Sequence, residues 1–278
     1  MSLSLPPLPL DGWRPTRDAL HGHARVLGAI RRALAPPEPH WWHISLLPRP
    51  SGLSTGALPL PRGGSIELAL DMQRGALAVE ASDGRSWALP LDGRAAPDGA
   101  AELLPILRAV GAEPPLDPAA LGKADANPPS AFDRAAAGAW WQAARWFADV
   151  LTGLAAELPG RKSPVQLWPH HFDVALTWFS GRQVPGVDPA DVESAEEQMA
   201  FGFSTGDDGV PEPYVYVTAY PWPATLAEAS LPGPARWHAV GWQGAMLPYA
   251  SLASAADPTA LLLDVLRAAH AAGAARMA

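Results

Sequence analysis

The sequence predicts an α+β fold built from two similar halves related by a pseudo-twofold axis, each with an antiparallel sheet between two helices. Strand-like segments follow one another within each half instead of alternating with helices, which is typical of antiparallel sheets. Residues 42–46 (WHISL) align with residues 172–176 (FDVAL), and residues 106–109 (ILRA) align with residues 265–268 (VLRA). The alternative is that alanine-rich helices and similar strands align by accident.

The first half, residues 1–111, is expected to contain a helix, a strand, a meander and a second helix. Apolar residues recur at helical spacing from residue 13 to about residue 34, and Pro36-Pro37 ends this helix. A strand over 40–47 and a Pro/Ser/Gly-rich loop over 48–64 follow. Strands are expected over 66–70, 76–81 and 87–90, with turns at 73–75 and at Asp83-Gly84. A helix over 98–110 completes the half.

Residues 112–131 carry five prolines and little periodicity, so they are expected to link the halves. The second half, residues 132–278, begins with a helix over 132–158 that Pro159-Gly160 ends. Its strands are expected over 165–179, with a kink at Pro169, then over 199–203 and 214–220, with a short acidic helical turn at 190–197. Residues 245–249 (AMLPY) echo residues 87–91, and a helix over 258–272 follows Asp257 as N-cap. The halves are expected to form one compact unit.

The composition describes a globular protein without cysteine chemistry. The chain has 278 residues, of which 48% are hydrophobic and 17% charged, and its net charge is −8. No basic run is present, so neither nucleic acid nor a membrane is an expected partner. The absence of cysteine excludes disulfides and thiolate ligands. Because the chain lacks a secretory signal and a run of eighteen apolar residues, a cytoplasmic location is expected.

A G-x-S-x-G motif occurs at residues 202–206, around Ser204, and again at residues 52–56. A nucleophile elbow needs a strand before the serine and a helix directly after it. Residues 207–213 (DDGVPEP) cannot form that helix, because two prolines and a glycine interrupt it. Both motifs are therefore interpreted as turns.

A group of histidines and acidic residues is the best candidate site. His171 and Asp173 are two residues apart, so on a strand they share a face, and His43 holds the equivalent place in the first half. If the two strands approach the twofold axis, these three residues converge as catalytic groups. Three N/O ligands with an open position also match a catalytic divalent metal site. The residues considered for such a metal are His40, His43, His171, Asp173 and Glu197, with His170 as a further ligand.

Three alternatives stay open for this group: half-buried structural histidines, a divalent metal site, and acid–base chemistry without a metal. Tryptophans flank the group and offer walls for a flat or apolar ligand, although most of the twelve tryptophans are expected in the core. The candidate ligand-binding residues are Trp41, Trp42, Trp168, Trp178 and Arg182, the last as an anion clamp.

Several motifs together resemble an uncharacterised bacterial family, the domain of unknown function DUF5996. They are HWWHISL at 40–46, SPVQLW at 163–168, FDVALTWFSGR at 172–182, EEQMAFGF at 196–203 and PEPYVYVTAYP at 211–221. In this resemblance His40, His43 and Glu197 match family positions, whereas residues 169–171 (PHH) replace a Trp-Gly-Ser run and Glu196 replaces a histidine. The family brings no established reaction, so the resemblance implies a fold and a location for the site.

Two functions are therefore hypotheses. The first is a small-molecule enzyme with hydrolytic or acid–base chemistry in a tryptophan-lined pocket. The second is a non-catalytic ligand-binding or assembly module in which the same polar group is structural. The sequence predicts neither the substrate nor the oligomeric state.

Overall fold

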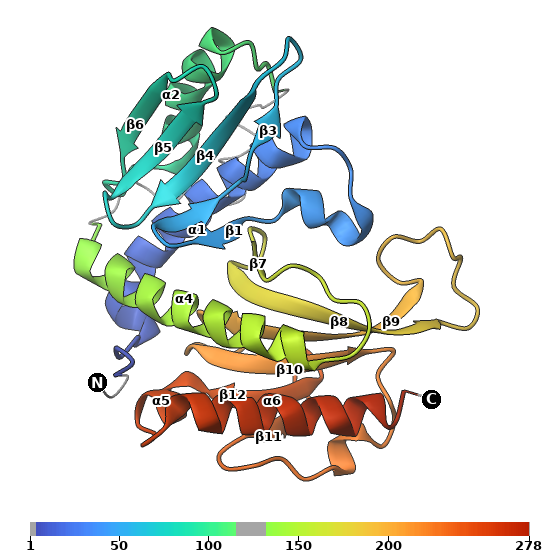
Figure 1. Cartoon of the computed structure of the whole chain (residues 1–278). Helices are drawn as coiled ribbons and strands as arrows, with labels where there is room; N and C mark the ends of the chain where they lie inside the picture. The colour runs from blue at the N-terminus through green and yellow to red at the C-terminus, as the bar shows by residue number, and fades with distance from the viewer. Residues whose placement is uncertain (1–3, 115–131, 278) are drawn as a thin grey trace. The chain divides into compact units, whose positions relative to one another are not determined.

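The computed structural model describes residues 4–114 and 132–277, which form two compact units (Figure 1). The N-terminal unit consists of residues 11–141 and 167–172, and the C-terminal unit consists of residues 1–10, 142–166 and 173–278, each within the described ranges. The division therefore passes through a helix, α4 (Arg134–Glu157), and not through the predicted linker. Most of that linker, residues 115–131, lies outside the described residues.

The N-terminal unit contains an antiparallel sheet in the order β1-β2-β4-β5-β6, with β3 paired to β4. Its elements are α1 (Leu10–Leu34), η1 (Pro39–Ile44), β1 (Leu47–Arg49), β2 (Gly52–Ser54), β3 (Leu58–Pro59), β4 (Ser65–Asp71), β5 (Ala76–Ala81), β6 (Ser86–Pro90) and α2 (Ala96–Ala109).

The predicted meander is confirmed as β4, β5 and β6. Ile66, Leu68 and Leu70 are buried along β4 while the residues between them are less so, as expected for a strand with one face in the core. The turns that join the three strands use Gly75 at φ +65° and Gly84 at φ +90°, a conformation that favours glycine. The two predicted helices of this half are also confirmed, with ends within four residues of those expected.

The predicted strand over 40–47 is wrong for most of its length, because residues 39–44 form the 3-10 helix η1. His40 and Trp41 have φ of 53° and 59°, in the left-handed region that no strand residue adopts. The buried guanidinium of Arg31 donates to the carbonyl of Trp42, at 3.1 Å, and to the carbonyl and hydroxyl of Ser45. These bonds satisfy backbone groups that a strand would have paired with a neighbour.

An aromatic stack joins three segments of the N-terminal unit that are distant in the sequence. Trp140, at the start of α4, stacks on Trp13 of α1 at 6.2 Å between ring centroids and on Phe172 at 4.6 Å. His21 stacks on the other side of this group, 5.3 Å from Phe172, and its Nε2 lies 2.9 Å from the carbonyl oxygen of Pro169. The turn at 169–172 is thereby part of the core of this unit.

The C-terminal unit contains a second antiparallel sheet in the order β11-β12-β10-β9-β8-β7. Besides the last part of α4, its elements are β7 (Gln166–Trp168), β8 (Asp173–Gln183), β9 (Glu196–Ser204), β10 (Tyr214–Tyr220), η2 (Leu226–Glu228), β11 (Arg236–His238), β12 (Gly244–Pro248), α5 (Tyr249–Ala253) and α6 (Pro258–Ala274).

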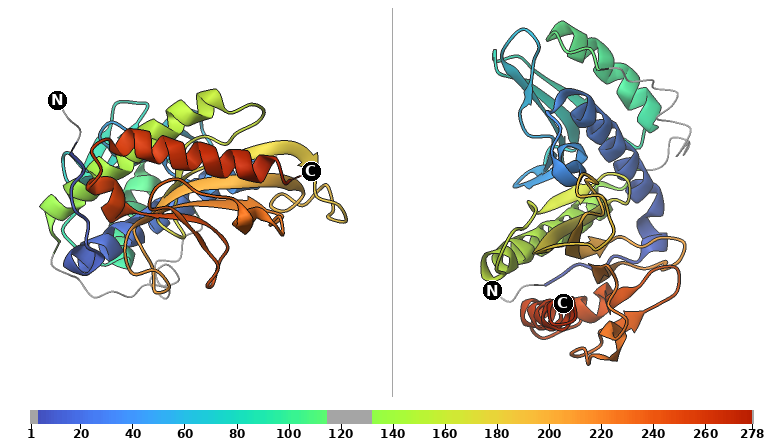
Figure 2. Two further views of the ribbon diagram at one scale, coloured as in Figure 1. Left: turned by 90° about the horizontal axis from the view of Figure 1, so that it is seen from below. Right: turned by 90° about the vertical axis from the view of Figure 1, so that its right-hand side faces the viewer.

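One face of this sheet carries helices, and we call it the helix face. Phe147 of α4 packs against Phe203 of β9, and His270 of α6 meets Trp178 of β8 edge-on at 4.5 Å. Figure 2 shows α4 and α6 on the same side of this sheet. An ion pair between Glu157 and Arg267, at 2.8 Å, links the two helices. Apolar residues at alternate positions of β8, β9 and β10 fill the layer between helices and sheet.

Several predictions for the second half are confirmed: the long helix, the β9–β10 hairpin, β12, and α6 with its N-cap. The N-cap carboxylate of Asp257 accepts a hydrogen bond from the amide of Ala260. The single strand over 165–179 is wrong, because a turn at 169–172 separates β7 from β8 and Phe172 has φ +56°. The acidic helical turn at 190–197 is confirmed in part: the amide of Ala195 donates to the carbonyl of Asp191 at 3.3 Å, whereas residues 196 and 197 already belong to β9.

The α+β class is confirmed by two antiparallel sheets with helices. The specific alignment of residues 42–46 with 172–176 as equivalent strands is wrong, since the first segment lies mainly in η1. The pseudo-twofold duplication stays a prediction. Within the described part of the chain, no helix is both long enough and apolar enough to span a bilayer.

Candidate functional site

The face of the C-terminal sheet opposite the helix face carries Tyr214 and Tyr216, and we call it the tyrosine face. Strand register places Ala175 of β8 beside Gly202 of β9, Gly202 beside Tyr216 of β10, and Tyr216 beside Met246 of β12. Directly paired residues lie on one face of a sheet. The tyrosine face therefore has two very small residues, Ala175 and Gly202, next to the ring of Tyr216.

Gly202 provides the space into which Tyr216 leans. A Cβ atom at Gly202 would lie 2.2–2.5 Å from three atoms of the Tyr216 side chain, closer than any non-bonded contact allows. The ring consequently crosses β9, and its hydroxyl donates a hydrogen bond to Oδ2 of Asp173, the first residue of β8. Glycine at this position fixes the direction of the tyrosine and brings it to the carboxylate.

Asp173 is 5% exposed, so its carboxylate is buried within the sheet. Burial, reinforced by the negative charge of Asp173, raises the pKa of Tyr216 well above its ordinary value. The phenol therefore stays protonated across the physiological range and acts as a donor. A buried carboxylate is unfavourable unless hydrogen bonds compensate its lost hydration, and Tyr216 supplies one of them.

A second tyrosine–carboxylate pair lies beside the first. The hydroxyl of Tyr214 donates to Oδ2 of Asp207 at 3.0 Å, while Oδ1 of Asp207 accepts from the amides of Gly209 and Val210 at 2.8 Å each. These bonds order the loop between β9 and β10. Burial, then the charge of Asp207, raises the pKa of Tyr214 as well.

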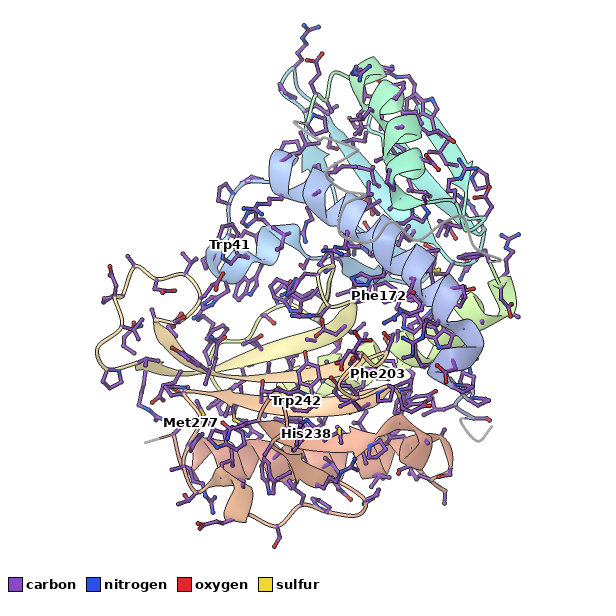
Figure 3. The ribbon with its side chains drawn as sticks, turned by 180° about the vertical axis from the view of Figure 1, so that it is seen from behind. Trp41, Phe172, Phe203, His238, Trp242 and Met277 are labelled. Carbon is purple, nitrogen blue, oxygen red and sulfur yellow. The ribbon has the colours of Figure 1, made fainter. Side chains whose placement is uncertain are left out.

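Trp242, from the loop between β11 and β12, covers part of the tyrosine face. Its ring is stacked on Tyr214 at 5.6 Å and meets Tyr216 edge-on at 6.2 Å. His238 of β11 packs against Trp242 at 4.4 Å, and Figure 3 shows these two side chains next to each other. The side chains of Trp242, Tyr216 and His238 are half-buried, whereas Tyr214 is buried. The face thus combines a buried carboxylate with an accessible aromatic surface.

The first group of predicted site residues lies on η1 in the N-terminal unit. His43 is buried, its Nδ1 accepts a 3.1 Å hydrogen bond from the amide of Glu38, and its ring stacks on Trp41. A neutral His43 therefore carries its proton on Nε2. His40 stacks on Trp42 at 5.7 Å. Within residues 40–43, each histidine thus stacks on the tryptophan two positions away.

The second group lies around the 169–172 turn of the same unit. His170 and His171 are exposed, their ring centroids are 4.4 Å apart, and Trp168 meets His170 edge-on. His21 faces this turn through Pro169. Burial and, after it, the neighbouring charge of Arg25 lower the pKa of His21 from 6.5 to about 4.

The remaining predicted residues belong to the C-terminal unit. Nε1 of Trp178 donates to the carbonyl of Pro159 at 2.7 Å, which makes this tryptophan part of the helix-face core. Nε of Arg182 donates to Oε2 of Glu197 at 2.8 Å, and Ser180 donates to the same oxygen. The predicted anion clamp and the predicted metal ligand are thus ion-paired with each other.

His43 and His171 belong to the N-terminal unit, and Asp173 begins the continuous main part of the C-terminal unit. Their convergence stays a prediction. Among the residues that the structure describes, no three or more His, Asp or Glu side chains form a group able to hold a metal ion. The divalent metal ligand set therefore has no geometric support within the described chain.

Ser204 ends β9, and its Oγ accepts from the amide of Gly206 at 3.1 Å. The following residues form the β9–β10 loop, with Gly206 at φ +94°, and no helix begins there. At the other motif, Oγ of Ser54 accepts from the amide of Gly56 at 2.7 Å. Gly52–Ser54 form β2 and Gly202–Ser204 end β9, so the interpretation of both motifs as turns is wrong for these residues. A loop and not a helix follows each serine, so neither motif is a nucleophile elbow.

Sequence reasoning identified Asp173 but missed Tyr216, Trp242 and His238. Tyr216 lies 43 positions from Asp173, and only the register of three strands brings them together. The available signal was the glycine between Phe201 and Phe203 in a strand, since an isolated glycine there often marks a close approach of another group.

The fold and site define an α+β protein with two antiparallel sheets and a tyrosine–carboxylate pair on the second. The chain belongs to the family of unknown function DUF5996, whose model matches residues 5–278. No curated protein and no solved structure matches the chain.

Proposed function

We propose that this protein is a cytoplasmic small-molecule enzyme of the acid–base or hydrolytic type, in which Asp173 is the catalytic carboxylate. The observation that carries the proposal is the hydrogen bond from Tyr216 to Asp173 through the space left by Gly202. A carboxylate held by a fixed donor in a buried position is the usual arrangement of a catalytic acid or base.

The sheet would be more simply stabilised by an apolar residue at position 173. The neighbouring positions on β8, Val174 to Phe179, are all buried and contain no other ionisable group. The cost of burying Asp173 is offset by Tyr216, which in turn depends on Gly202. Two residues on two other strands thus support the carboxylate of Asp173, which favours a functional role over a purely structural one.

In the proposed chemistry, the protonated phenol of Tyr216 fixes the carboxylate of Asp173 and stabilises its charged form. The carboxylate then removes a proton from a bound substrate, or from a water molecule that attacks it. Trp242, stacked on the buried ring of Tyr214, supplies a flat apolar surface against which a substrate can lie. The catalytic roles predicted for His43 and His171, and the predicted divalent metal, stay predictions. The proposed role of Asp173 does not depend on them.

The proposal is tested by pairing binding with stability. A library of small aromatic esters, amides and carboxylic acids is screened by ligand-observed NMR, and the ester binders are assayed for hydrolysis. We expect Asp173→Asn to abolish binding or turnover with little change in melting temperature. Asp208→Asn, an exposed carboxylate in the β9–β10 loop, is the matched control and should behave as wild type.

The second candidate function is a non-catalytic ligand-binding or assembly module, in which Tyr216 and Asp173 only stabilise the sheet. The pair of Tyr216 and Asp173 lies beside a second pair, Tyr214 and Asp207, which orders the β9–β10 loop. The structural role of this second pair favours the alternative. It predicts the reverse result: Asp173→Asn lowers the melting temperature and leaves ligand binding unchanged.

We also propose that the two units derive from one ancestral half. Each has a long helix before an antiparallel sheet and a helix after it. An experimental structure of a relative in which β4–β6 and β8–β10 cannot be superposed together with their flanking helices would contradict this origin.

A further inference from the structure

A groove in the C-terminal unit lies far along the chain from Asp173 and plays no part in the proposed chemistry. Residues 5–9 form one wall, and the ends of β12 and α5, with the residues before β10, form the other. Its volume is about 530 Å³, which is within the range of small-molecule sites. Its lining is mainly proline, leucine and alanine side chains.

The walls of the groove are held in place by hydrogen bonds. The hydroxyl of Tyr249 donates to the carbonyl of Pro6 at 2.7 Å, and Nε2 of Gln142 donates to the carbonyl of Ser4 at 3.2 Å. On the opposite side, the amide of Tyr249 donates to the carbonyl of Pro213 at 3.0 Å. Four lining residues are prolines, whose fixed φ limits backbone motion. The groove is therefore formed before a ligand arrives, which lowers the entropic cost of binding.

Glu212 is the only charged side chain among the described residues that line the groove. The two lining hydroxyls are already used as donors, since Tyr249 bonds Pro6 and Ser254 bonds Ala250 at 2.9 Å. Asp207 and Asp208, in the same loop as Glu212, add to the negative potential there. An apolar groove with a carboxylate at its edge is complementary to an apolar molecule that carries a positive charge.

We propose that this groove binds small apolar amines, with the hydrocarbon part between the proline-rich walls and the protonated amino group at Glu212. This inference is independent of the proposed enzymatic function, because neither Asp173, Tyr216 nor Trp242 lines the groove.

The test uses 2-phenylethylamine and its neutral analogue 2-phenylethanol, which have nearly the same shape, in NMR titrations of the full-length protein at pH 7. We expect saturable binding of the amine with a dissociation constant on the order of 1 mM. The alcohol should bind about three- to fivefold more weakly, which is the usual contribution of an exposed charge pair. Glu212→Gln should remove this difference and leave the affinity for the alcohol unchanged. Glu228→Gln, an exposed carboxylate outside the groove, is the control and should retain the difference.

Ala253→Phe tests whether the groove itself is the site, since the larger side chain fills it. We expect both ligands to bind at least tenfold more weakly to this variant. If Ala253→Phe does not fold, Ser254→Phe at the exposed edge serves instead. Equal affinities for amine and alcohol in the wild type, unchanged binding in the filled variant, or no saturable binding at 20 mM ligand would each overturn the proposal.

Discussion

The hydroxyl of Tyr216 on β10 donates a hydrogen bond to the carboxylate of Asp173 on β8, across the intervening strand β9. A tyrosine ring can span that distance only because β9 contributes no side chain at Gly202. The hydrogen bond thus depends on three strands, and Asp173, Gly202 and Tyr216 can each be substituted separately.

Removal of the phenol should destabilise the protein. In Tyr216→Phe the buried carboxylate of Asp173 loses a donor while the ring is kept, so we expect a loss of about 1–3 kcal/mol in the free energy of unfolding. Urea denaturation monitored by tryptophan fluorescence measures this change. Tyr220→Phe, at the exposed end of the same strand, should differ from wild type by less than about 0.5 kcal/mol. Equal stability of the two variants would show that the hydrogen bond does not support the fold.

Two glycine substitutions should have opposite effects. Gly202→Ala places a methyl group within 2.5 Å of the Tyr216 ring, so we expect destabilisation by about 1–3 kcal/mol and loss of the bond to Asp173. Gly153→Ala, in α4, meets nothing within 4 Å and should stabilise the protein by about 0.5–1 kcal/mol. Differential scanning calorimetry of both variants measures whether the stability decreases in Gly202→Ala and increases in Gly153→Ala. A stabilised Gly202→Ala variant would contradict the account of the site.

The contrast between two segments shows which parts of the fold could be predicted. The β4–β6 meander was predicted from local alternation and glycine turns, because both signals lie within the strands themselves. The segment HWWHISL also alternates, yet its backbone is set by Arg31, which lies at the end of α1 and binds two of its carbonyls. A contact from another element overrode the local pattern, and the sequence contains no local signal for it.

Some residues of the candidate site could likewise be predicted from the local sequence and others could not. Asp173 was found because it lies two positions from His171 in a segment with strand-like alternation. Tyr216 was not, because YVYVTAY reads as an ordinary strand until its register with β9 is known. Trp242 was missed for a related reason, since it reaches the tyrosine face from a loop without periodicity.

Stability should fall in mild acid because of a buried histidine. His23 of α1 is 2% exposed, its ring packs against Gly99 of α2, and within the described chain neither ring nitrogen has a hydrogen-bond partner. Burial and, to a smaller extent, nearby Arg94 lower its pKa from 6.5 to about 4, against the opposing charge of Asp92. The unfolded state therefore binds the proton more tightly, so stability decreases as the pH falls from about 6.5 to about 4.

For His23 alone this loss is on the order of 3 kcal/mol. Urea unfolding at pH 7.0, 5.5 and 4.5 measures it. His23→Leu should be at least as stable as wild type at pH 7 and should lose much less stability in acid. His171→Gln, which removes an exposed histidine, should retain the wild-type pH dependence. Parallel pH profiles for wild type and His23→Leu would assign the acid sensitivity to other groups.

Replacement of Arg31 should disrupt η1. Arg31→Met removes the donor to the carbonyls of Trp42 and Ser45, and we expect a loss of about 2–3 kcal/mol together with faster amide exchange in residues 39–46. Hydrogen–deuterium exchange with mass spectrometry reads the local effect. Arg32→Met, which removes an exposed cation 5.1 Å from the Trp41 ring, should cost less than about 1 kcal/mol. Unchanged exchange in Arg31→Met would mean that the turn holds its conformation by other contacts.

Ser204 should not react as a nucleophile. Its hydroxyl lies in a hairpin loop and accepts from the amide of Gly206, with no helix N-terminus behind it. We expect no labelling by a fluorophosphonate probe, and we expect Ser204→Ala to keep any ligand binding of the wild type. Mass-spectrometric detection of an adduct on Ser204 would overturn this interpretation.

The stack of Trp13, Trp140 and Phe172 has a consequence for how this protein can change over evolution. Trp13 precedes the proline-rich segment 112–131, and Trp140 and Phe172 follow it. If the gene were divided at this segment, the N-terminal product would lack two of the three rings. Neither product would then be self-sufficient, and exchange of halves between relatives would separate rings that have adapted to one another. The family model extends over both units, from residue 5 to residue 278.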